Sequence, residues 1–394
     1  MFGKAALEAV LGKLRVGGLT VQWWDGSKKS YGPGKPVATL ALNDPSVVGR
    51  MLRNMSLGFS ECYMDGLIEI EGDIRDLIIL AHQNRAAFPK LSHRTFGSFV
   101  RGVTLAASAA QSRQDISHHY DRGNDFYALW LDETMIYSCA YFKKKTDTLK
   151  EAQLQKIDHT LKKLQLQKGM RLLDIGSGWG WLILTAAKRY GVHTHGITHS
   201  KEQLAKTRAR IKAEGLEQLV TVELRDYREL TGTEMYDRIV SVGMYEHVGR
   251  PNQRQYFETV TRLLKPGGIS LLHTITKHLE LPMDPMISKH IFPGTYVPSW
   301  REVINFLPEY DLHLTDVESL RRHYAMTVDH WSKNYEREVE KVREMFDEHF
   351  VRMWRLYLRG GTTAFELGTL DLHQFVFTKG ITNDLPLTRE YLYR

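Results

Sequence analysis

The sequence lacks several features that would define a protein class at once. It contains only two cysteines, Cys62 and Cys139, which are too few for a disulfide framework. No run approaches the roughly 18 consecutive apolar residues of a membrane-spanning helix, and we find no internal repeat or long low-complexity tract. The amphipathic segment 1–18 has neither the apolar core nor the cleavage site of a signal peptide. We therefore expect a cytoplasmic protein with reduced thiols.

What remains is the composition of an ordinary globular protein. Apolar residues make up 42% and charged residues 25% of the 394 residues, and this length favours about two or three domains. The net charge of +7 suits an anionic partner, either membrane phospholipid or nucleic acid, although it also serves solubility alone. Charge therefore does not decide between these partners.

The first 105 residues have the pattern of a small α+β domain. An Asp-Gly turn signal at 25–26 separates two extended segments, and a further strand is expected at 36–44. Helical patterns follow at 46–58 and 73–85. We therefore expect residues 1–105 to form a separate N-terminal domain.

Two segments close this domain and lead out of it. Residues 89–102 mix basic with aromatic and aliphatic side chains, which is typical of a segment on a membrane surface or of a last amphipathic helix on its own core. Residues 104–117 are small and polar, as in an inter-domain linker or a linking helix. We place a linker at 106–117 and a second domain at 118–394.

The second domain begins with a helical pattern at 149–167. Leu154, Ile157, Leu161 and Leu164 recur at helical spacing and predict one buried stripe. Strands and helices then alternate, which predicts an α/β domain with a parallel sheet covered on both faces. The expected strands are 170–176, 192–198, 219–224, 236–243 and 268–275, and the expected helices 179–189, 201–214, 252–264, 300–307 and 334–358, with a last extended segment at 373–379.

A glycine-rich turn at 176–180 follows the first of these strands. Its alternate glycines let the backbone approach a ligand closely at a helix N-terminus, but the third glycine comes one residue too early for a dinucleotide fingerprint. With Asp174 before it, the spacing D-x-G-x-G-x-G is typical of S-adenosylmethionine (SAM) methyltransferases. Asp226, after the third strand, suits the adenine amino group, with Tyr227 stacking nearby. A structural turn or another nucleotide site is the alternative.

The position after the second strand departs from most methyltransferases. Residues 196–200 contain no acid to hold the ribose hydroxyls. Thr198 and Gln203 are the neutral side chains that could replace it.

Several ordered motifs carry a resemblance to one family. The sequence resembles the cyclopropane-fatty-acyl-phospholipid synthases, relatives of the mycolic acid cyclopropane synthases. Residues 61–73 are similar to the full-length phospholipid enzymes, since the shorter mycolic acid enzymes lack that domain. The matching motifs in the second domain are 118–133, 135–142, 173–180, 196–203, 236–249, 271–275, 289–300 and 321–327.

The resemblance implies a fold, a reaction and an unusual base. The fold is a Rossmann-like SAM-dependent methyltransferase domain behind a smaller lipid-binding domain. The reaction adds a methylene group from SAM to the cis double bond of an acyl chain in a membrane phospholipid. The base is a bound bicarbonate ion, and its matching ligands are Cys139, Glu246, His273, the backbone of Ile275, and Tyr324. From the residues alone, a metal site or a nucleophilic Cys139 remains an alternative.

The same resemblance implies the cofactor contacts and the partners. The contacts are Tyr137, Ser138, Gly176, Gly178, Thr198, Gln203 and Tyr227, with Asp174 organising the loop and Asp226 near the adenine. We expect no metal and no nucleic acid, peripheral association with the inner face of the cell membrane, and leave a homodimer open. Two other functions stay in view: a methyltransferase that makes methyl-branched or related lipids, and a lipid- or nucleic-acid-binding protein with a degenerate cofactor fold.

Overall fold

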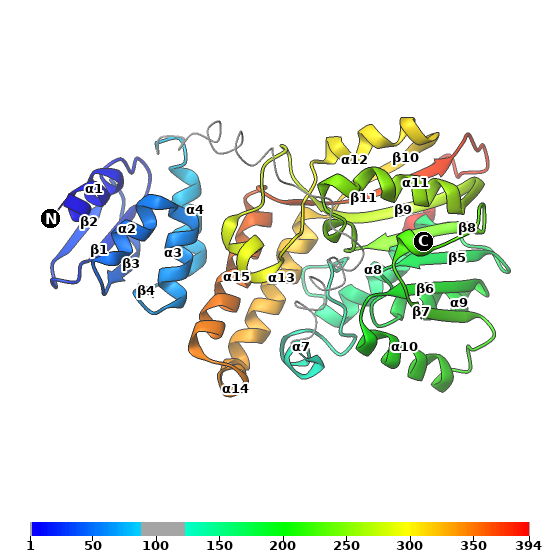
Figure 1. Ribbon diagram of the computed structural model, residues 1–394, viewed down its shortest axis with the longest axis horizontal. Coiled ribbons are helices and arrows are strands. Elements are labelled where there is room, and N and C mark those ends of the chain that lie inside the picture. The colour runs from blue at the N-terminus through cyan, green and yellow to red at the C-terminus, as the bar shows by residue number, and fades with distance from the viewer. Residues whose placement is uncertain (1, 88–122, 394) are drawn as a thin grey trace. The chain divides into compact units, whose positions relative to one another are not determined.

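The structure is a computed structural model that describes residues 2–87 and 123–393 (Figure 1). The chain divides into two compact units. The smaller unit contains residues 1–105, 284–293 and 331–367, and the larger unit contains 106–283, 294–330 and 368–394. The expected membrane segment 89–102 lies outside the described residues, as does the expected linker 106–117.

The smaller unit contains the α+β arrangement expected from the sequence. Its four-stranded sheet has the order β2-β1-β3-β4, and β1 pairs with β2 in antiparallel fashion across a turn where Gly26 has a φ of +80°. One expected helix is two helices, because Asn54 ends the first and accepts a hydrogen bond from Leu57 N as the cap of the second. The elements are α1 (Phe2–Leu11), β1 (Gly18–Gln22), β2 (Lys28–Tyr31), β3 (Pro36–Leu42), α2 (Ser46–Arg53), α3 (Met55–Met64), β4 (Ile68–Glu71) and α4 (Ile74–Gln83).

Two later segments also belong to the smaller unit, so the second domain is not continuous from 118 to 394 as expected. The expected helix 334–358 is the end of α13 (Arg321–Arg337), then α14 (Val339–Met345) and α15 (Glu348–Glu366). Helix α15 packs against α3 and α4, where Trp354 is wholly buried. An amphipathic helix is stable where its apolar face is covered, and here that cover comes from distant parts of the chain.

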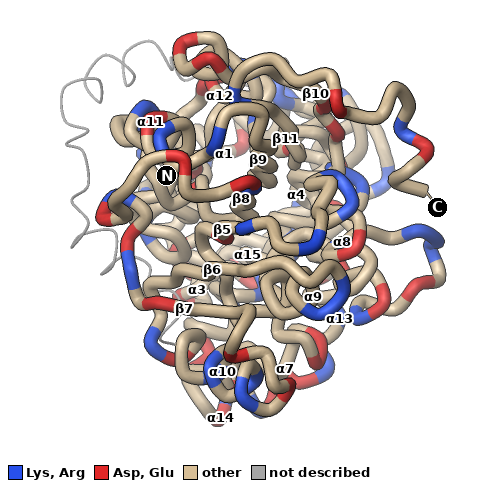
Figure 2. Tube along the Cα trace, turned by 90° about the vertical axis from the view of Figure 1, so that its right-hand side faces the viewer, with Lys and Arg blue, Asp and Glu red and all other residues tan. Residues whose placement is uncertain are grey.

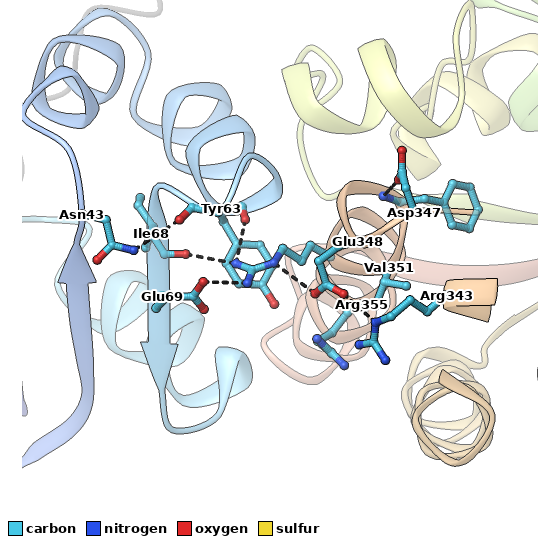
Figure 3. Close-up of polar contacts among 12 residues, drawn as sticks. Asn43, Tyr63, Ile68, Glu69, Arg343, Asp347, Glu348, Val351 and Arg355 are labelled. Carbon is cyan, nitrogen blue, oxygen red and sulfur yellow. Dashed lines mark hydrogen bonds and ion pairs between the residues drawn. The ribbon is translucent and has the colours of Figure 1, made fainter. Parts of the chain in front are cut away.

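A half-buried arginine of α15, Arg352, links this helix to α3 and β4 (Figure 3). Arg352 donates to the carbonyls of Tyr63 and Ile68, at 3.2 and 3.4 Å, and to the Glu69 carboxylate at 2.6 Å. It also lies over the Tyr63 ring and bonds Glu348 one turn earlier. The guanidinium satisfies groups from three elements at once.

The larger unit is built on one seven-stranded sheet with the order β10-β11-β9-β8-β5-β6-β7. The pairs among β5 to β9 are parallel, and β11 pairs in antiparallel fashion with β9 and β10. The predicted α/β fold is thus confirmed, while β10 was not expected. The strands are β5 (Arg171–Ile175), β6 (His193–Thr198), β7 (Val220–Leu224), β8 (Tyr236–Val242), β9 (Leu264–Thr276), β10 (Leu312–Ser319) and β11 (Asp371–Lys379).

Helices cover both faces of this sheet, because neighbouring residues of a strand face opposite sides. Leu271 packs with α8 and α9 on one face, and Leu272 packs with α11 and α12 on the other. Among the described residues, no helix is long and apolar enough to cross a membrane. The helices are α7 (Asn124–Trp130), α8 (Leu149–Lys163), α9 (Trp181–Tyr190), α10 (Lys201–Ala213), α11 (Gln253–Leu263) and α12 (Trp300–Phe306).

Helix α8 differs from the expected helix with a single buried apolar stripe. Leu154 is 39% exposed, whereas Ile157, Leu161 and Leu164 are buried as expected. The helix also buries a second, polar face, which carries Gln153, Lys156, His159, Thr160 and Lys163. Those polar side chains lie next to the site described below.

Candidate active site

A cavity of about 160 Å³ lies beyond the carboxyl ends of the parallel strands, where ligands of open α/β sheets bind. Its walls come from the residues that follow β5, β6, β7 and β8 and from the segment before α8. All nine expected cofactor residues line it, namely Tyr137, Ser138, Asp174, Gly176, Gly178, Thr198, Gln203, Asp226 and Tyr227.

The glycine loop has two glycines with different tasks. Gly176 has a φ of +92°, and a Cβ there would lie 2.9 Å from Met244 Cβ, so the fold itself requires this glycine. Gly178 has a φ of +54°, and a Cβ there would meet no protein atom within 4 Å. Because Gly178 also lines the cavity, a side chain at this position would affect a ligand more than the protein.

A buried lysine in the cavity wall was missed from the sequence. Lys156 donates to Ser138 Oγ at 2.9 Å, and burial lowers its pKa to about 8. Burial likewise raises the pKa of Asp174 to about 7, while Lys156 opposes that rise. The spacing of Gln153, Lys156, Thr160 and Lys163 is helical, but a polar stripe normally indicates a solvent face.

The two neutral side chains after β6 lie together, where most methyltransferases place an acid. Thr198 Oγ1 donates to the side-chain Oε1 of Gln203 at 2.7 Å. The backbone N–H of Gln203 donates to the side chain of Ser200, which caps the start of α10. His199 lines the same wall, 3.4 Å from Asp226, with Nδ1 buried and unpartnered among the described residues. His199 is a second wall residue that sequence reasoning missed.

Asp226 is held as an anion. Burial alone would raise the pKa of Asp226, but hydrogen bonds from His199 and Arg228 keep this pKa below its usual range. Arg228 bonds both carboxylate oxygens, at 2.9 and 2.7 Å. The Arg228 backbone amide also donates to Oδ1, at 2.9 Å, and His199 Nε2 lies 3.4 Å from Oδ2. Since a carboxylate has about four acceptor sites, the described residues already supply a donor for each of them, the contact from His199 being the longest. Tyr227 follows with its hydroxyl buried and unpartnered among the described residues.

None of the five expected bicarbonate ligands is among the residues that line this cavity. Glu246 follows β8 and accepts a hydrogen bond from the Ile275 amide at 2.6 Å. Cys139, Ile275 and Tyr324 belong to one apolar cluster. His273 precedes Ile275 by two positions on β9, so both residues face the same side of the sheet. Cys139 directly follows the cavity residue Ser138.

Glu246 and His273 each keep one buried atom without a partner among the described residues. These atoms are Glu246 Oε2 and His273 Nε2. Burial raises the pKa of Glu246 to about 6, against the lowering effect of the Ile275 amide. Burial also holds the pKa of His273 well below its usual value, so its ring is neutral near pH 7.

The thiol of Cys139 is wholly buried, and burial raises its pKa. It donates to the carbonyl of Ala140 at 3.2 Å. A protonated thiol is a poor nucleophile, so the geometry does not favour covalent catalysis by Cys139. In the part of the chain that the structure describes, no three His, Cys, Asp or Glu side chains converge as a metal site would need.

The sheet order and the cavity at its carboxyl edge define the larger unit as a SAM-dependent methyltransferase fold. The family model described as mycolic acid cyclopropane synthetase matches residues 107–375, and the chain belongs to this family. The resemblance inferred from the sequence motifs is thereby confirmed. A second model, for a domain of unknown function, matches residues 6–93.

Relatives of known name cover nearly the whole chain. The "Probable fatty acid methyltransferase" of Pseudomonas putida is 38% identical over 95% of this chain and 96% of its own length. The cyclopropane-fatty-acyl-phospholipid synthase of Escherichia coli K12 is 38% identical over 90% of this chain and 92% of its own. The crystal structure of mycolic acid cyclopropane synthase CmaA1 with SAH and CTAB is 35% identical, with a TM-score of 0.64 over 68% of this chain and 98% of that one.

Proposed function

We propose that this protein transfers a methylene group from SAM to the cis double bond of unsaturated acyl chains in membrane phospholipids, closing a cyclopropane ring with bound bicarbonate as the general base. When bound, SAM supplies an electrophilic methyl group, and bicarbonate accepts the proton that this group loses as the ring closes. The observation that carries the proposal is the pair of buried, unpartnered atoms Glu246 Oε2 and His273 Nε2.

The cavity supports the cofactor part of the proposal. The Asp226 carboxylate is fixed by Arg228 and would accept from the adenine amino group in place of the longer contact from His199, while Thr198 and Gln203 offer neutral partners for ribose hydroxyls. Tyr137 and Ser138 line the same cavity. Lys156 holds the Ser138 hydroxyl and offers a buried positive charge to an acidic ligand group.

The base site fits hydrogen carbonate by its chemistry. A buried polar atom without a partner destabilises the protein. The two such atoms here are a carboxylate oxygen of Glu246, which accepts hydrogen bonds, and an imidazole nitrogen of His273. Hydrogen carbonate carries one hydroxyl donor and several acceptor oxygens. Glu246 would accept from its hydroxyl, while His273 and Tyr324 would donate to its oxygens. The Ile275 amide already orients the carboxylate of Glu246.

The membrane part of the proposal concerns the smaller unit. We propose that residues 1–105, with the two later segments of the smaller unit, form a lipid-binding domain, joined by a linker at 106–117 to a catalytic domain made of the rest of 118–394. We also propose that the enzyme is cytoplasmic and docks on the inner membrane surface. Basic and acidic residues are interspersed along the chain, as the blue and red positions in Figure 2 show. Docking would then depend on local basic residues: vesicle binding should weaken with rising salt and after charge reversal at Arg94 and Arg101. Unchanged vesicle sedimentation in both tests would contradict membrane docking through these residues.

A homodimer is also part of the proposal, and light scattering of the purified protein tests it.

Methyl-branched lipid is the second candidate product, because the relative from Pseudomonas putida is named a probable fatty acid methyltransferase. Gas chromatography with mass spectrometry of lipids from cells expressing the chain separates the two. A gain of one CH₂ in a product that resists mild hydrogenation supports ring closure. A gain of CH₂ with the double bond intact or reduced supports methyl branching, and unchanged lipids contradict both.

A further inference from the structure

A glutamine on the neighbouring strand contacts the ring of His273. Gln374 lies directly opposite His273 in the antiparallel register of β11 and β9, and its side chain is wholly buried. Its Nε2 atom is 3.1 Å from His273 Nδ1 and 3.3 Å from Thr160 Oγ1. The Gln374 side chain therefore joins the candidate base site to helix α8.

The distances around Thr160 assign the hydrogens. Thr160 Oγ1 is 2.8 Å from the carbonyl oxygen of Lys156, an ordinary O–H···O distance, so its one hydrogen points to that carbonyl. Thr160 then accepts from Gln374, and 3.3 Å suits an N–H donor better than an O–H donor. The amide group of Gln374 that faces both neighbours is its NH₂, and one of its hydrogens points to Nδ1 of His273.

We propose that Gln374 is a positioning residue that holds His273 in the tautomer with its hydrogen on Nε2. This inference rests on the proposed function, since it assigns the donor that the bicarbonate site needs. An Nδ1 that accepts from an amide cannot carry a hydrogen, so the neutral ring must carry it on Nε2. That nitrogen is the buried atom without a partner among the described residues, and it becomes a fixed donor toward an oxyanion.

With the opposite tautomer, His273 could not donate a hydrogen bond to bicarbonate. With its hydrogen on Nδ1, His273 would turn a lone pair at Nε2 toward the anion, and the amide of Gln374 would have to reverse. The ring would then repel a bicarbonate oxygen instead of donating to it. Losing one buried donor of this kind weakens binding by roughly tenfold or more.

Two variants test the tautomer directly. Gln374→Glu keeps the shape but replaces the donor with a carboxylate acceptor, which should draw a hydrogen onto Nδ1. Gln374→Leu removes the hydrogen bond altogether. The matched control is Thr378→Val, also buried on β11 but bonded to the carbonyl of Gly380 and remote from His273. Thermal unfolding of each variant checks that the sheet is intact.

The readout is the ¹⁵N NMR spectrum of histidine-labelled protein, with the His273 signals assigned by difference from His273→Gln. In the wild type and in Thr378→Val, we expect a protonated Nε2 and an unprotonated Nδ1, and in Gln374→Glu a protonated Nδ1. A wild-type ring protonated on Nδ1, or an unchanged tautomer in a folded Gln374→Glu, overturns the inference.

Bicarbonate affinity gives a second readout without turnover. Titration of bicarbonate-stripped protein with ¹³C-bicarbonate should show at least about tenfold weaker binding by Gln374→Glu than by Thr378→Val. Equal affinities overturn the role of Gln374. A wild type that binds no bicarbonate contradicts the proposed function instead, and the tautomer measurement then decides the assignment of His273 by itself.

Discussion

The Glu246 carboxylate accepts a hydrogen bond from the Ile275 amide at 2.6 Å, while its second oxygen is buried without a partner among the described residues. Thr274, which also lies near this carboxylate, donates its hydroxyl to the carbonyl of Ile275. One oxygen is thus used to fix the side chain, and the other is left for chemistry. The arrangement explains how a buried carboxylate can be rigid and still available.

The cofactor cavity should respond to a small change at Gly178. Gly178→Ala should weaken SAM binding by roughly tenfold, because its methyl group meets no protein atom but lies in the cavity wall. Gly215→Ala is the matched control, since Gly215 also has a positive φ and open space, yet lies outside the wall. Calorimetric titration of both variants measures the difference. Equal affinities would remove Gly178 from the site. Gly176 is a poorer probe, because a side chain there collides with Met244.

Lys156 lies on helix α8 and lines the cavity, so its replacement should lower the affinity for SAM. Lys156→Met removes the donor to Ser138 and the charge that lowers the pKa of Asp174. We expect SAM affinity to fall about tenfold. Lys162→Met, on the same helix but in a partly exposed ion pair with Asp158 and outside the cavity wall, should leave the SAM affinity unchanged. Calorimetry on both proteins is the measurement, and matching affinities would show that Lys156 is only structural.

Burial of Asp174 should appear in the pH dependence of stability. Its pKa is raised from 3.8 to about 7, so its contribution favours the folded state at low pH and is lost as pH rises to about 7. In Asp174→Asn the free energy of unfolding at pH 8 should rise by at most about 4 kcal/mol, with little gain at pH 4. Urea unfolding of ligand-free protein tests this. Asp158→Asn, in a partly exposed ion pair with Lys162, is the control. A gain that is equal at both pH values contradicts the assignment.

The smaller unit should depend on α15. Arg352→Met leaves the carbonyls of Tyr63 and Ile68 without this donor and should destabilise that unit by about 1–3 kcal/mol. Arg337→Met, an exposed arginine of α13 in the same unit, should cost far less. Limited proteolysis and thermal unfolding measure both. Similar losses of stability in the two variants would mean that the Arg352 hydrogen bonds do not stabilise the smaller unit.

Sequence reasoning reached the local elements and the cofactor motif because both are encoded by neighbouring residues. The glycine loop and the strand that precedes it lie within one short segment, and the alternation of apolar strands with helices indicates the parallel sheet. The grouping of α15 with the first residues was missed, because an apolar stripe shows that a helix is buried but does not identify its partner. Lys156 and Gln374 were missed for a related reason. A polar residue on a buried face or a strand becomes visible only when its neighbours across the fold are known.

The central claim is that Glu246 acts through a bound bicarbonate ion, and one measurement tests it most directly. Cyclopropane formation on unsaturated phospholipid vesicles is followed with bicarbonate stripped and then returned, in the wild type and in Glu246→Gln. The glutamine can still accept from Ile275 but presents an NH₂ where the free oxygen was, so turnover should fall at least 10²–10⁴-fold while SAM affinity is kept. Wild-type activity should disappear without bicarbonate and return with it. Activity that is indifferent to bicarbonate, with near-normal turnover in Glu246→Gln, would contradict the account.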